Sequence, residues 1–221
     1  MTLSEEDYIK ALYHLGKEEH GSVSTNAVAE QMRTKPSSVT DMLKKLSDKK
    51  LVNYRKYKGA SLTDLGRTTA LNIIRKHRLW EVFLVEKLDF AWDEVHEVAE
   101  QLEHIKSEKL TDQLDKYLGF PSFDPHGDPI PSKEGNFKKV ARMLLSEVSV
   151  DTVGVCVAVR DSSEAFLNFL DKNHISLGDK IKILDREDFD NSLHIVIRDR
   201  QIHISHQIAE NLYLQINQES I

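Results

Sequence analysis

The sequence predicts a mainly α-helical chain with small β parts: a winged helix-turn-helix, a helical middle region and a small C-terminal β-barrel. Helical spacing of apolar residues over much of residues 1–118 is the first observation. Two short β-type segments that follow two short helices are the second, and a change of the apolar period to two beyond residue 147 is the third. We therefore place domains at residues 1–65, 66–145 and 146–221.

A first helix and then two shorter helices joined by a tight turn are predicted at the start of the chain. The apolar spacing indicates a helix over residues 4–19. Ser24 or Thr25 can cap a helix that runs to residue 32. A further helix over residues 36–46 begins with proline, which the first helical turn favours.

Two strands follow directly. Residues 51–55 and 60–63 have β-type composition, and the turn between them contains Gly59, which tolerates turn conformations. Helix, turn, helix and hairpin is the order of elements in a winged helix, so residues 1–65 are predicted to have that fold.

The middle region is predicted to be helical. Residues 64–88 form one long helix whose later apolar residues surround the axis, which is typical of a buried helix. An amphipathic helix over residues 92–109 and another over 111–118 follow, and we expect these helices to form the core of a dimer. Four of the five prolines lie between residues 121 and 131, so a linker is predicted over residues 119–144.

The last 75 or so residues predict short strands. Val153, Val155, Val157 and Val159 alternate with other residues, and isoleucines do the same near residues 181, 195 and 202. One helical segment over residues 163–172 interrupts them. The pattern predicts a small β-barrel.

Charge is unevenly distributed along the chain. The formal net charge is −6, yet residues 26–60 contain nine Lys or Arg and only three Asp or Glu. Such a segment on an acidic body indicates a surface for a polyanion, although many charged runs are only solvated faces.

Several classes of protein are excluded by composition. The longest apolar stretch has seven residues, too short to span a bilayer, and the acidic start is unlike a signal peptide. One cysteine, Cys156, excludes an internal disulfide and a thiolate-rich zinc site. We expect a cytoplasmic chain with no membrane partner, and any metal ligands should be histidines and carboxylates.

Potential metal ligands gather on one face of the helix predicted near residue 100. His96, Glu100, Glu103 and His104 fall within an arc of about 100°, opposite the apolar stripe. The alternative interpretation is a solvated acidic face. Imidazoles and carboxylates without thiolates suit divalent ions, with a preference for harder ions such as Mn²⁺.

The neighbouring long helix adds His77 and Glu81, spaced by four residues where the helix is apolar all round. A buried carboxylate there needs an ion or a charged partner. A buried salt bridge to Arg78 or Lys76 is the alternative. Asp7 on the first helix is another potential ligand, although an acid in a first turn is also favoured by the helix dipole.

Seven short motifs occur in a specific order and spacing. They are Glu6-Asp7-Tyr8-Ile9, Pro36-Ser37-Ser38-Val39-Thr40, Leu62-Thr63-Asp64-Leu65-Gly66, Arg75-Lys76-His77-Arg78-Leu79 with Glu81, Val95-His96-Glu97, Leu102-Glu103-His104 and Pro125-His126-Gly127-Asp128-Pro129-Ile130-Pro131. Together they make the sequence resemble the diphtheria-toxin-repressor family of metal-dependent transcriptional regulators over almost its full length.

The resemblance implies a homodimeric, non-enzymatic regulator that binds double-stranded operator DNA. Its domains would be an N-terminal winged helix, a helical dimerisation domain and a C-terminal SH3-like domain of the kind found in iron-transport accessory proteins. Each subunit would bind one or two divalent ions. The principal site would fall on Asp7, His77, Glu100, Glu103 and His104. A second site would draw on Glu81 and His96, with Asp124 and His126 as alternative ligands.

The residue types at the principal site predict the metal. The family's iron-sensing branch has methionine at the Asp7 position and cysteine at the Glu100 position, and both soft ligands are missing here. Hard oxygen donors favour Mn²⁺, with Fe²⁺ as the alternative. Lys10 stands where the short manganese sensors have a second acid, and a protonated lysine cannot coordinate, so a two-ion cluster like theirs is not expected.

DNA-binding residues are expected in the basic segment and in the second helix of the turn motif. Ser37, Ser38 and Thr40 are the expected base-facing residues. The expected phosphate contacts are Lys44, Lys45, Arg55, Lys56 and Lys58. Lys35, just before that helix, is also expected to bind DNA.

Two other functions remain open at this point. A metallohydrolase is disfavoured because the sequence has no His-Glu-x-x-His helix and no clear nucleophile. A winged-helix regulator that senses an organic ligand is more plausible, since the fold does not specify the effector. We predict a metal-dependent repressor activated by Mn²⁺.

Overall fold

A computed structural model describes residues 1–18 and 22–216. The chain divides into two compact units. Unit 1 comprises Met1–Trp80, Ala99–Lys116 and Pro131–Phe137, and unit 2 comprises the remaining segments Glu81–Val98, Tyr117–Ile130 and Lys138–Ile221. Among the described residues, no helix is both long and apolar enough to cross a membrane.

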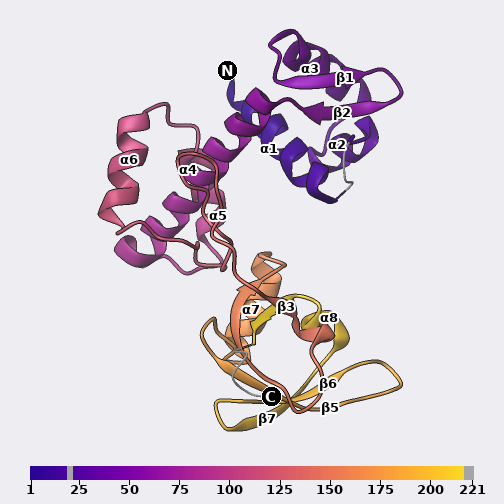
Figure 1. Ribbon diagram of the computed structural model, residues 1–221, viewed down its shortest axis with the longest axis vertical. Coiled ribbons are helices and arrows are strands. Elements are labelled where there is room, and N and C mark those ends of the chain that lie inside the picture. The colour runs from indigo at the N-terminus through magenta and orange to yellow at the C-terminus, as the bar shows by residue number, and fades with distance from the viewer. Residues whose placement is uncertain (19–21, 217–221) are drawn as a thin grey trace. The chain divides into compact units, whose positions relative to one another are not determined.

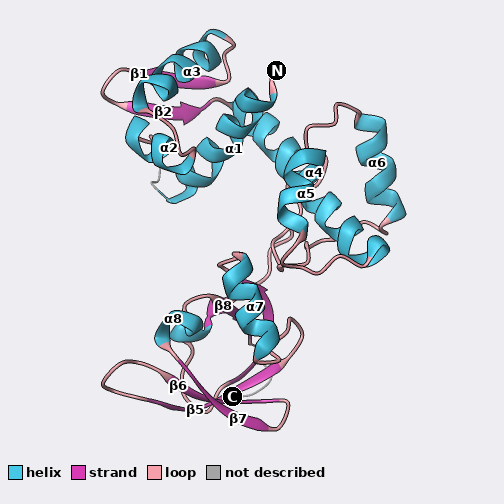
Figure 2. Cartoon of the chain, turned by 180° about the vertical axis from the view of Figure 1, so that it is seen from behind, coloured by secondary structure: helices cyan, strands magenta, loops and turns pink. Residues whose placement is uncertain are grey.

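Unit 1 begins with the predicted winged helix (Figures 1 and 2). Its elements are α1 (Leu3–Glu18), α2 (Thr25–Gln31), α3 (Pro36–Asp48), β1 (Val52–Arg55) and β2 (Gly59–Leu62). The two strands pair antiparallel, and Val23 adds an isolated bridge to Ala60 of β2. Ile9, Leu43 and Leu46 are completely buried between the helices. The predicted order of elements is confirmed.

Local hydrogen bonds fix where these helices begin. The Ser24 side chain accepts a hydrogen bond from the backbone N–H of Ala27, as an N-cap does. Thr2 and Glu5 form a reciprocal capping box at the start of α1, with N–H to oxygen distances of 2.9 and 3.3 Å. Pro36 occupies the first turn of α3, as predicted.

Three further helices follow: α4 (Asp64–Leu88), α5 (Val95–Leu102) and α6 (Glu108–Tyr117). The bounds of α4 match the prediction. The predicted helix over residues 92–109 is wrong in length, because the chain turns after Leu102. The expectation that α4 is buried all round also fails at its end, where Leu88 is 51% exposed.

Unit 2 contains a curved antiparallel sheet (Figure 2). Within the described part of the chain its strand order is β3-β8-β4-β5-β6-β7. The strands are β3 (Met143–Leu144), β4 (Val153–Val159), β5 (Lys180–Arg186), β6 (Leu193–Ile197), β7 (Arg200–Ile204) and β8 (Leu212–Gln215). The accompanying helices are η1 (Leu145–Glu147), α7 (Glu164–Lys172) and α8 (His206–Ala209). A small β domain with an inserted helix is confirmed.

The core of this β domain comes from the residues that face inward with period two. Ile181 and Ile183 of β5 and Leu193, Ile195 and Ile197 of β6 are all completely buried. The last strand and α8 could not be predicted, because their short apolar runs carry little periodic signal.

Candidate metal centre and DNA-binding surface

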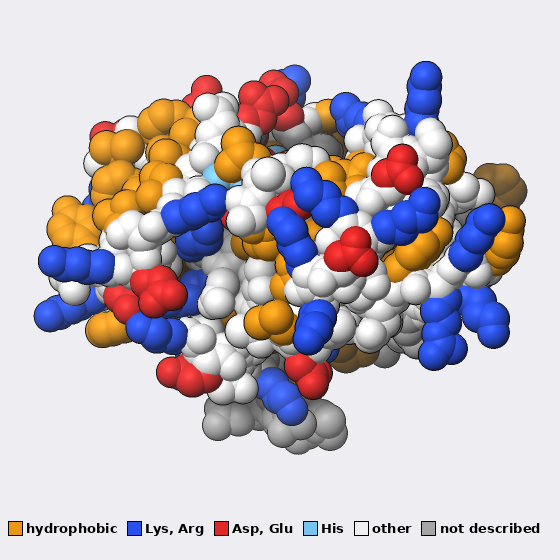
Figure 3. All heavy atoms as spheres, turned by 90° about the horizontal axis from the view of Figure 1, so that it is seen from above, with side chains coloured by type: hydrophobic (Ala, Val, Ile, Leu, Met, Phe, Trp, Pro, Cys, Tyr) orange, Lys and Arg blue, Asp and Glu red, His pale blue; other side chains and the backbone are white. Residues whose placement is uncertain are grey.

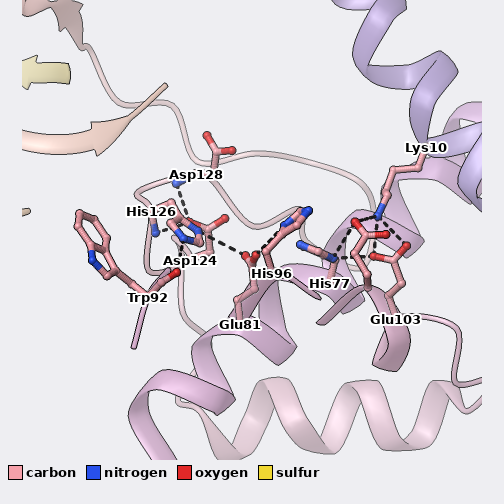
Figure 4. A network of polar contacts seen from close by, with 10 residues as sticks. Lys10, His77, Glu81, Trp92, His96, Glu103, Asp124, His126 and Asp128 are labelled. Atoms are coloured by element: carbon pink, nitrogen blue, oxygen red, sulfur yellow. Dashed lines mark hydrogen bonds and ion pairs between the residues drawn. The ribbon is translucent and has the colours of Figure 1, made fainter. Parts of the chain in front are cut away.

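Glu103 is the buried centre of a polar group in unit 1, which we call the Glu103 cluster: Asp7, Lys10, His77, Glu100, Glu103 and His104. Figure 4 shows Lys10 and His77 on either side of Glu103. The Glu103 side chain has no exposed surface. His77 Nδ1 lies 2.6 Å from Glu103 Oε2, and Lys10 Nζ lies 2.8 Å from each carboxylate oxygen. Burial raises the pKa of Glu103, but the contacts with His77 and Lys10 outweigh it and hold this pKa below its usual value.

Lys10 reaches from α1 into this cluster. Its ammonium group lies 2.5 Å from Glu100 Oε1 as well as beside Glu103, and its side chain is only 15% exposed. His77 Nδ1 is 3.8 Å from the same Glu100 oxygen. Lys10 therefore supplies positive charge beside two adjacent carboxylates, one of which is fully buried.

His104 is held between two carboxylates. Its Nδ1 lies 2.7 Å from Glu6 Oε2, and its Nε2 lies 3.1 Å from Asp7 Oδ1. Because the Glu6 carboxylate contacts Nδ1, Nε2 is the ring nitrogen that faces Asp7. Histidines that bind metals are oriented by carboxylates in this way. Glu6 is 4% exposed, and no local sequence pattern predicts this contact with His104.

The arrangement of donors fits a divalent cation. Asp7, Glu103 and His104 each offer a ligand atom, and these three atoms lie within 4.8 Å of one another. Burial raises the pKa of Asp7, and the nearby charges of His104 and Lys10 oppose that effect. Carboxylate oxygens with imidazole nitrogen suit ions such as Mn²⁺ and Fe²⁺. The helix-face prediction needs one correction: Glu103 and His104 lie in the turn after α5, and Glu103 is buried, not solvated.

A second group, the His126 cluster, lies in unit 2 and comprises Glu81, His96, Asp124 and His126 (Figure 4). Glu81, Asp124 and His126 are buried and offer ligand atoms within 4.8 Å of one another. His96 Nδ1 lies 3.5 Å from Glu81 Oε1, although the His96 side chain is 54% exposed. The four residues predicted for a second site therefore come together.

His126 is oriented by the backbone of Trp92. Its Nε2 lies 2.8 Å from the Trp92 carbonyl oxygen, which can only accept, so this nitrogen carries a proton. Nδ1 then faces Glu81 at 3.8 Å and Asp124 at 3.9 Å. Burial lowers the pKa of His126, but the two carboxylates outweigh burial and raise it. In the neutral ring, Nδ1 has a lone pair directed at the carboxylates.

The loop that carries Asp124 is built around its carboxylate. Asp124 Oδ1 accepts from the backbone N–H of His126 at 2.9 Å and of Asp128 at 3.0 Å. Gly127 has φ +82°, and a Cβ there would lie 2.1 Å from the Val157 carbonyl oxygen. The loop is thus held by hydrogen bonds to the Asp124 carboxylate and by the close approach of Gly127 to the backbone of Val157.

The start of α3 presents a polar surface. Lys35, Ser37 and Ser38 are exposed, as base-reading or phosphate-contacting residues must be. Thr40 is partly buried, and its hydroxyl donates to the Pro36 carbonyl oxygen at 3.0 Å. Lys44 is exposed, and its Nζ lies 3.3 Å from Asp41 Oδ1.

The wing carries further cations. Arg55, Lys56 and Lys58 are exposed, and Tyr57 between them is 93% exposed. Lys56 Nζ lies 4.9 Å from the centre of the Tyr57 ring. Figure 3 shows many Lys and Arg side chains on the surface formed by α3 and the wing. Tyr57 was missed because a lone tyrosine in a turn has no distinguishing pattern.

Lys45 has an intramolecular partner. Glu5 is completely buried, and its Oε1 lies 2.9 Å from Lys45 Nζ and 2.8 Å from Lys49 Nζ. The hydrogen bond from Lys49 lowers the pKa of Glu5 to about 2, with Lys45 and the Thr2 backbone acting in the same direction against burial. Glu5 thus joins the start of α1 to the end of α3, a link that the sequence pattern did not reveal.

Comparison with known protein families gives three consecutive matches. Residues 1–60 match the N-terminal DNA binding domain of the iron dependent repressor, and residues 63–132 match the metal binding and dimerisation domain of the iron dependent repressor. Residues 143–216 match the FeoA domain.

Individual proteins show the same similarity. An uncharacterized HTH-type transcriptional regulator of Methanocaldococcus jannaschii is 36% identical over 118 residues, which are 53% of this chain and 94% of that protein. The iron-dependent repressor IdeR of Mycobacterium tuberculosis is 34% identical over 127 residues, 57% of this chain. The matched residues make up about half of IdeR (54%). A "Probable metal transport system membrane protein" of Chlamydia trachomatis is 45% identical over 73 residues, which are 33% of this chain and 16% of that protein.

Solved structures with this fold cover nearly the whole chain. A manganese-dependent transcriptional repressor in complex with manganese has a TM-score of 0.85 and 31% identity, and the match covers 96% of this chain and 100% of that one. The manganese regulator SloR has a TM-score of 0.76 and 32% identity, and the match covers 98% and 100% of the two chains.

Proposed function

The chain belongs to the iron-dependent (diphtheria-toxin) repressor family, and on that premise we propose that it is a transcriptional repressor whose affinity for operator DNA rises when Mn²⁺ binds. The observation that carries this proposal is the Glu103 cluster. There, carboxylates and an oriented imidazole converge within unit 1, which also contains α3 and the wing. An ion that binds these donors more tightly in one arrangement of unit 1 would shift the protein toward that arrangement, and this can change its affinity for DNA.

The principal ion would be held by Asp7, His77, Glu100, Glu103 and His104. When bound, the ion supplies a double positive charge that carboxylates from separate segments share. Asp7 belongs to α1 of the winged helix, whereas Glu103 and His104 follow α5. By drawing these segments together, the ion would fix how the winged helix is presented to DNA. The ion would therefore act as a clamp and not as a catalyst.

The remaining residues of the site act by positioning. Glu6 keeps His104 in the tautomer that directs Nε2 toward Asp7. A second ion would be held by Glu81, His96, Asp124 and His126, where the Trp92 carbonyl oxygen sets the His126 tautomer in the same manner. This gives one or two ions per subunit.

The choice of metal rests on ligand hardness. Asp7 and Glu100 offer hard oxygen ligands at the two positions where the iron-sensing branch of the family has methionine and cysteine. Hard oxygen ligands support Mn²⁺ over Fe²⁺. Relatives of both kinds exist, since solved structures of similar fold are named as manganese-dependent and IdeR is named as iron-dependent. Fe²⁺ is the alternative that the experiment below separates.

We further propose a homodimer that acts in the cytoplasm without enzymatic activity. The match of residues 63–132 to a metal binding and dimerisation domain supports the dimer. Residues 1–65 would bind DNA, residues 66–145 would bind metal and dimerise, and residues 146–221 would form the SH3-like domain. Ser37, Ser38 and Thr40 would face bases, while Lys44, Lys45 and the wing cations would contact phosphates, with Lys35 beside them.

The test is DNA binding by protein that has been stripped with a chelator. A duplex is first selected from a random-sequence library by Mn²⁺-loaded protein, and then titrated with stripped protein in Mn²⁺, Fe²⁺ (without oxygen) or Zn²⁺. We expect specific binding to require metal and to appear at the lowest free concentration with Mn²⁺. Glu103→Gln should abolish the response, whereas Glu86→Gln, which changes an exposed carboxylate of α4, should not. Equal binding by stripped and loaded protein would refute the proposal.

A further inference from the structure

Two histidines face each other across the β6–β7 hairpin of unit 2. The strands pair from Ile197↔Arg200 at the turn to His194↔His203 farther along. The turn consists of Arg198 and Asp199, with φ of 48° and 62°. Two positive φ values are the signature of a type I′ turn, which fixes the register of a hairpin.

The position of the pair along the ladder brings the two side chains close together. In an antiparallel pair, hydrogen-bonded and non-hydrogen-bonded residue pairs alternate, and the pair that closes a two-residue turn is hydrogen-bonded. Counting three steps from Ile197↔Arg200, His194↔His203 is a non-hydrogen-bonded pair, the type with the shorter side-chain separation. The imidazole rings are stacked, with centroids 4.1 Å apart and planes 8° from parallel.

Both rings lie on the outer face of the sheet. Leu193, Ile195 and Ile197 point inward and are completely buried, so the intervening residue His194 points outward. His194 is partly exposed and His203 is exposed. Solvent therefore reaches the pair, and neither ring is needed for the hydrophobic core.

The third strand adds a carboxylate to the same row. A register shift between Ile183 and Asp185 in β5 places Asp185 opposite His194. Asp185 is exposed. The register thus aligns Asp185, His194 and His203 across β5, β6 and β7 (Figure 1 labels the strands).

We propose that His194 and His203, with Asp185 as a third ligand, form a surface site for a divalent ion that prefers imidazole, namely Zn²⁺ or Cu²⁺. Each neutral imidazole offers one nitrogen lone pair, and exposed side chains rotate between rotamers on the nanosecond timescale, which allows the stacked rings to converge on one ion. Imidazole ligands bind Cu²⁺ and Zn²⁺ far better than Mn²⁺. The site consequently differs from the Glu103 cluster in residues, location and metal preference.

The experiment counts and locates Zn²⁺ and Cu²⁺ on the full chain. Equilibrium dialysis of the parent against Zn²⁺ should show one more bound equivalent per chain than the His203→Gln variant shows in the same concentration range. Binding through two side chains of one rigid hairpin is intramolecular after the first contact, so losing either histidine should weaken this equivalent roughly 100-fold. His174→Asn, which changes an exposed histidine elsewhere in unit 2, should keep the parent's stoichiometry.

A second measurement locates the ion without any DNA. Substoichiometric Cu²⁺ should broaden the NMR signals of the His194 and His203 rings before those of His174. Asp185→Asn should weaken the same equivalent without removing it, and parent-like affinity in that variant would remove Asp185 from the site. Unchanged stoichiometry and affinity in both His194→Gln and His203→Gln, with native thermal unfolding, would overturn the proposal.

Discussion

Replacing Lys10 with glutamine should weaken the metal-free fold and strengthen metal binding by the same free energy. Lys10 Nζ contacts Glu100 at 2.5 Å and both oxygens of buried Glu103 at 2.8 Å. A divalent ion that binds these carboxylates must take over the place of the ammonium group. Glutamine keeps a similar length and one polar donor but removes the charge.

The magnitude follows from the burial of the partners. Removing one member of a buried ion pair costs about 3 to 5 kcal/mol, because the other charge is left without compensation. Glu103 is fully buried, but Glu100 is 36% exposed and His77 still contacts Glu103. We therefore expect the lower end, a loss of about 3 kcal/mol in the free energy of unfolding without metal. If Mn²⁺ binding removes this destabilisation, Lys10→Gln should bind Mn²⁺ roughly 100-fold more tightly than the parent does.

The assay compares chemical denaturation of parent and Lys10→Gln with chelator and with saturating Mn²⁺, together with Mn²⁺ titrations of both proteins. The two proteins should differ in stability with chelator and become nearly equal with Mn²⁺, because binding adds stability in proportion to the logarithm of affinity. Lys44→Gln, which removes an exposed lysine paired with exposed Asp41, should change neither quantity. Equal or weaker Mn²⁺ binding by Lys10→Gln would refute the reasoning, since Lys10 would then remain beside the carboxylates in the metal-bound protein.

Three further substitutions and one thiol-reactivity assay test other features of the molecule. Glu6→Gln should weaken Mn²⁺ binding about 10- to 100-fold by titration, because His104 loses its orienting carboxylate, while exposed Glu30→Gln should have no effect. Glu5 has its pKa lowered to about 2 in the folded chain from 4.5, so its contribution to stability is complete above pH 4.5 and is lost as the pH falls toward 2; Glu5→Gln should flatten the acid-unfolding curve in that window. Gly127→Ala should lower the free energy of unfolding by more than about 1 kcal/mol in denaturant titrations, from positive φ and the clash with a carbonyl oxygen. Burial raises the pKa of Cys156 to about 12, so native protein should resist a thiol reagent at pH 8 and react only on unfolding.

The fold was predictable wherever the apolar period extended over many residues. The long run of helical spacing gave the bounds of α4, and proline at residue 36 marked the start of α3. The predicted helix over residues 92–109 was too long, because amphipathic spacing continues through the turn that ends α5 at Leu102. Strand β8 was missed because its four residues are too few to establish a period, and it follows α8 and not a glycine-containing turn of the kind that joins the equally short β1 and β2.

The candidate site was predictable in residue types but not in protonation or in supporting contacts. Spacing along one helix indicated Glu100 and Glu103 as ligands, but it gave no sign that Glu103 is completely buried. That Lys10 pairs with both of these carboxylates, and that Glu6 orients His104, depends on how α1 packs, which is a tertiary contact without a local pattern.

The coupling of metal binding to DNA binding is tested by a pair of titrations on parent and Asp7→Ala: Mn²⁺ with and without the selected DNA duplex, and duplex with and without Mn²⁺. If metal and DNA binding are coupled by a typical 1 to 3 kcal/mol, Mn²⁺ should raise DNA affinity roughly 5- to 150-fold, and the duplex must raise Mn²⁺ affinity by the same factor. Asp7→Ala should lose most of this mutual effect and keep the metal-free DNA affinity, because Asp7 is the proposed ligand from α1. Full metal-dependent tightening in Asp7→Ala would contradict the clamp that links α1 to the residues following α5.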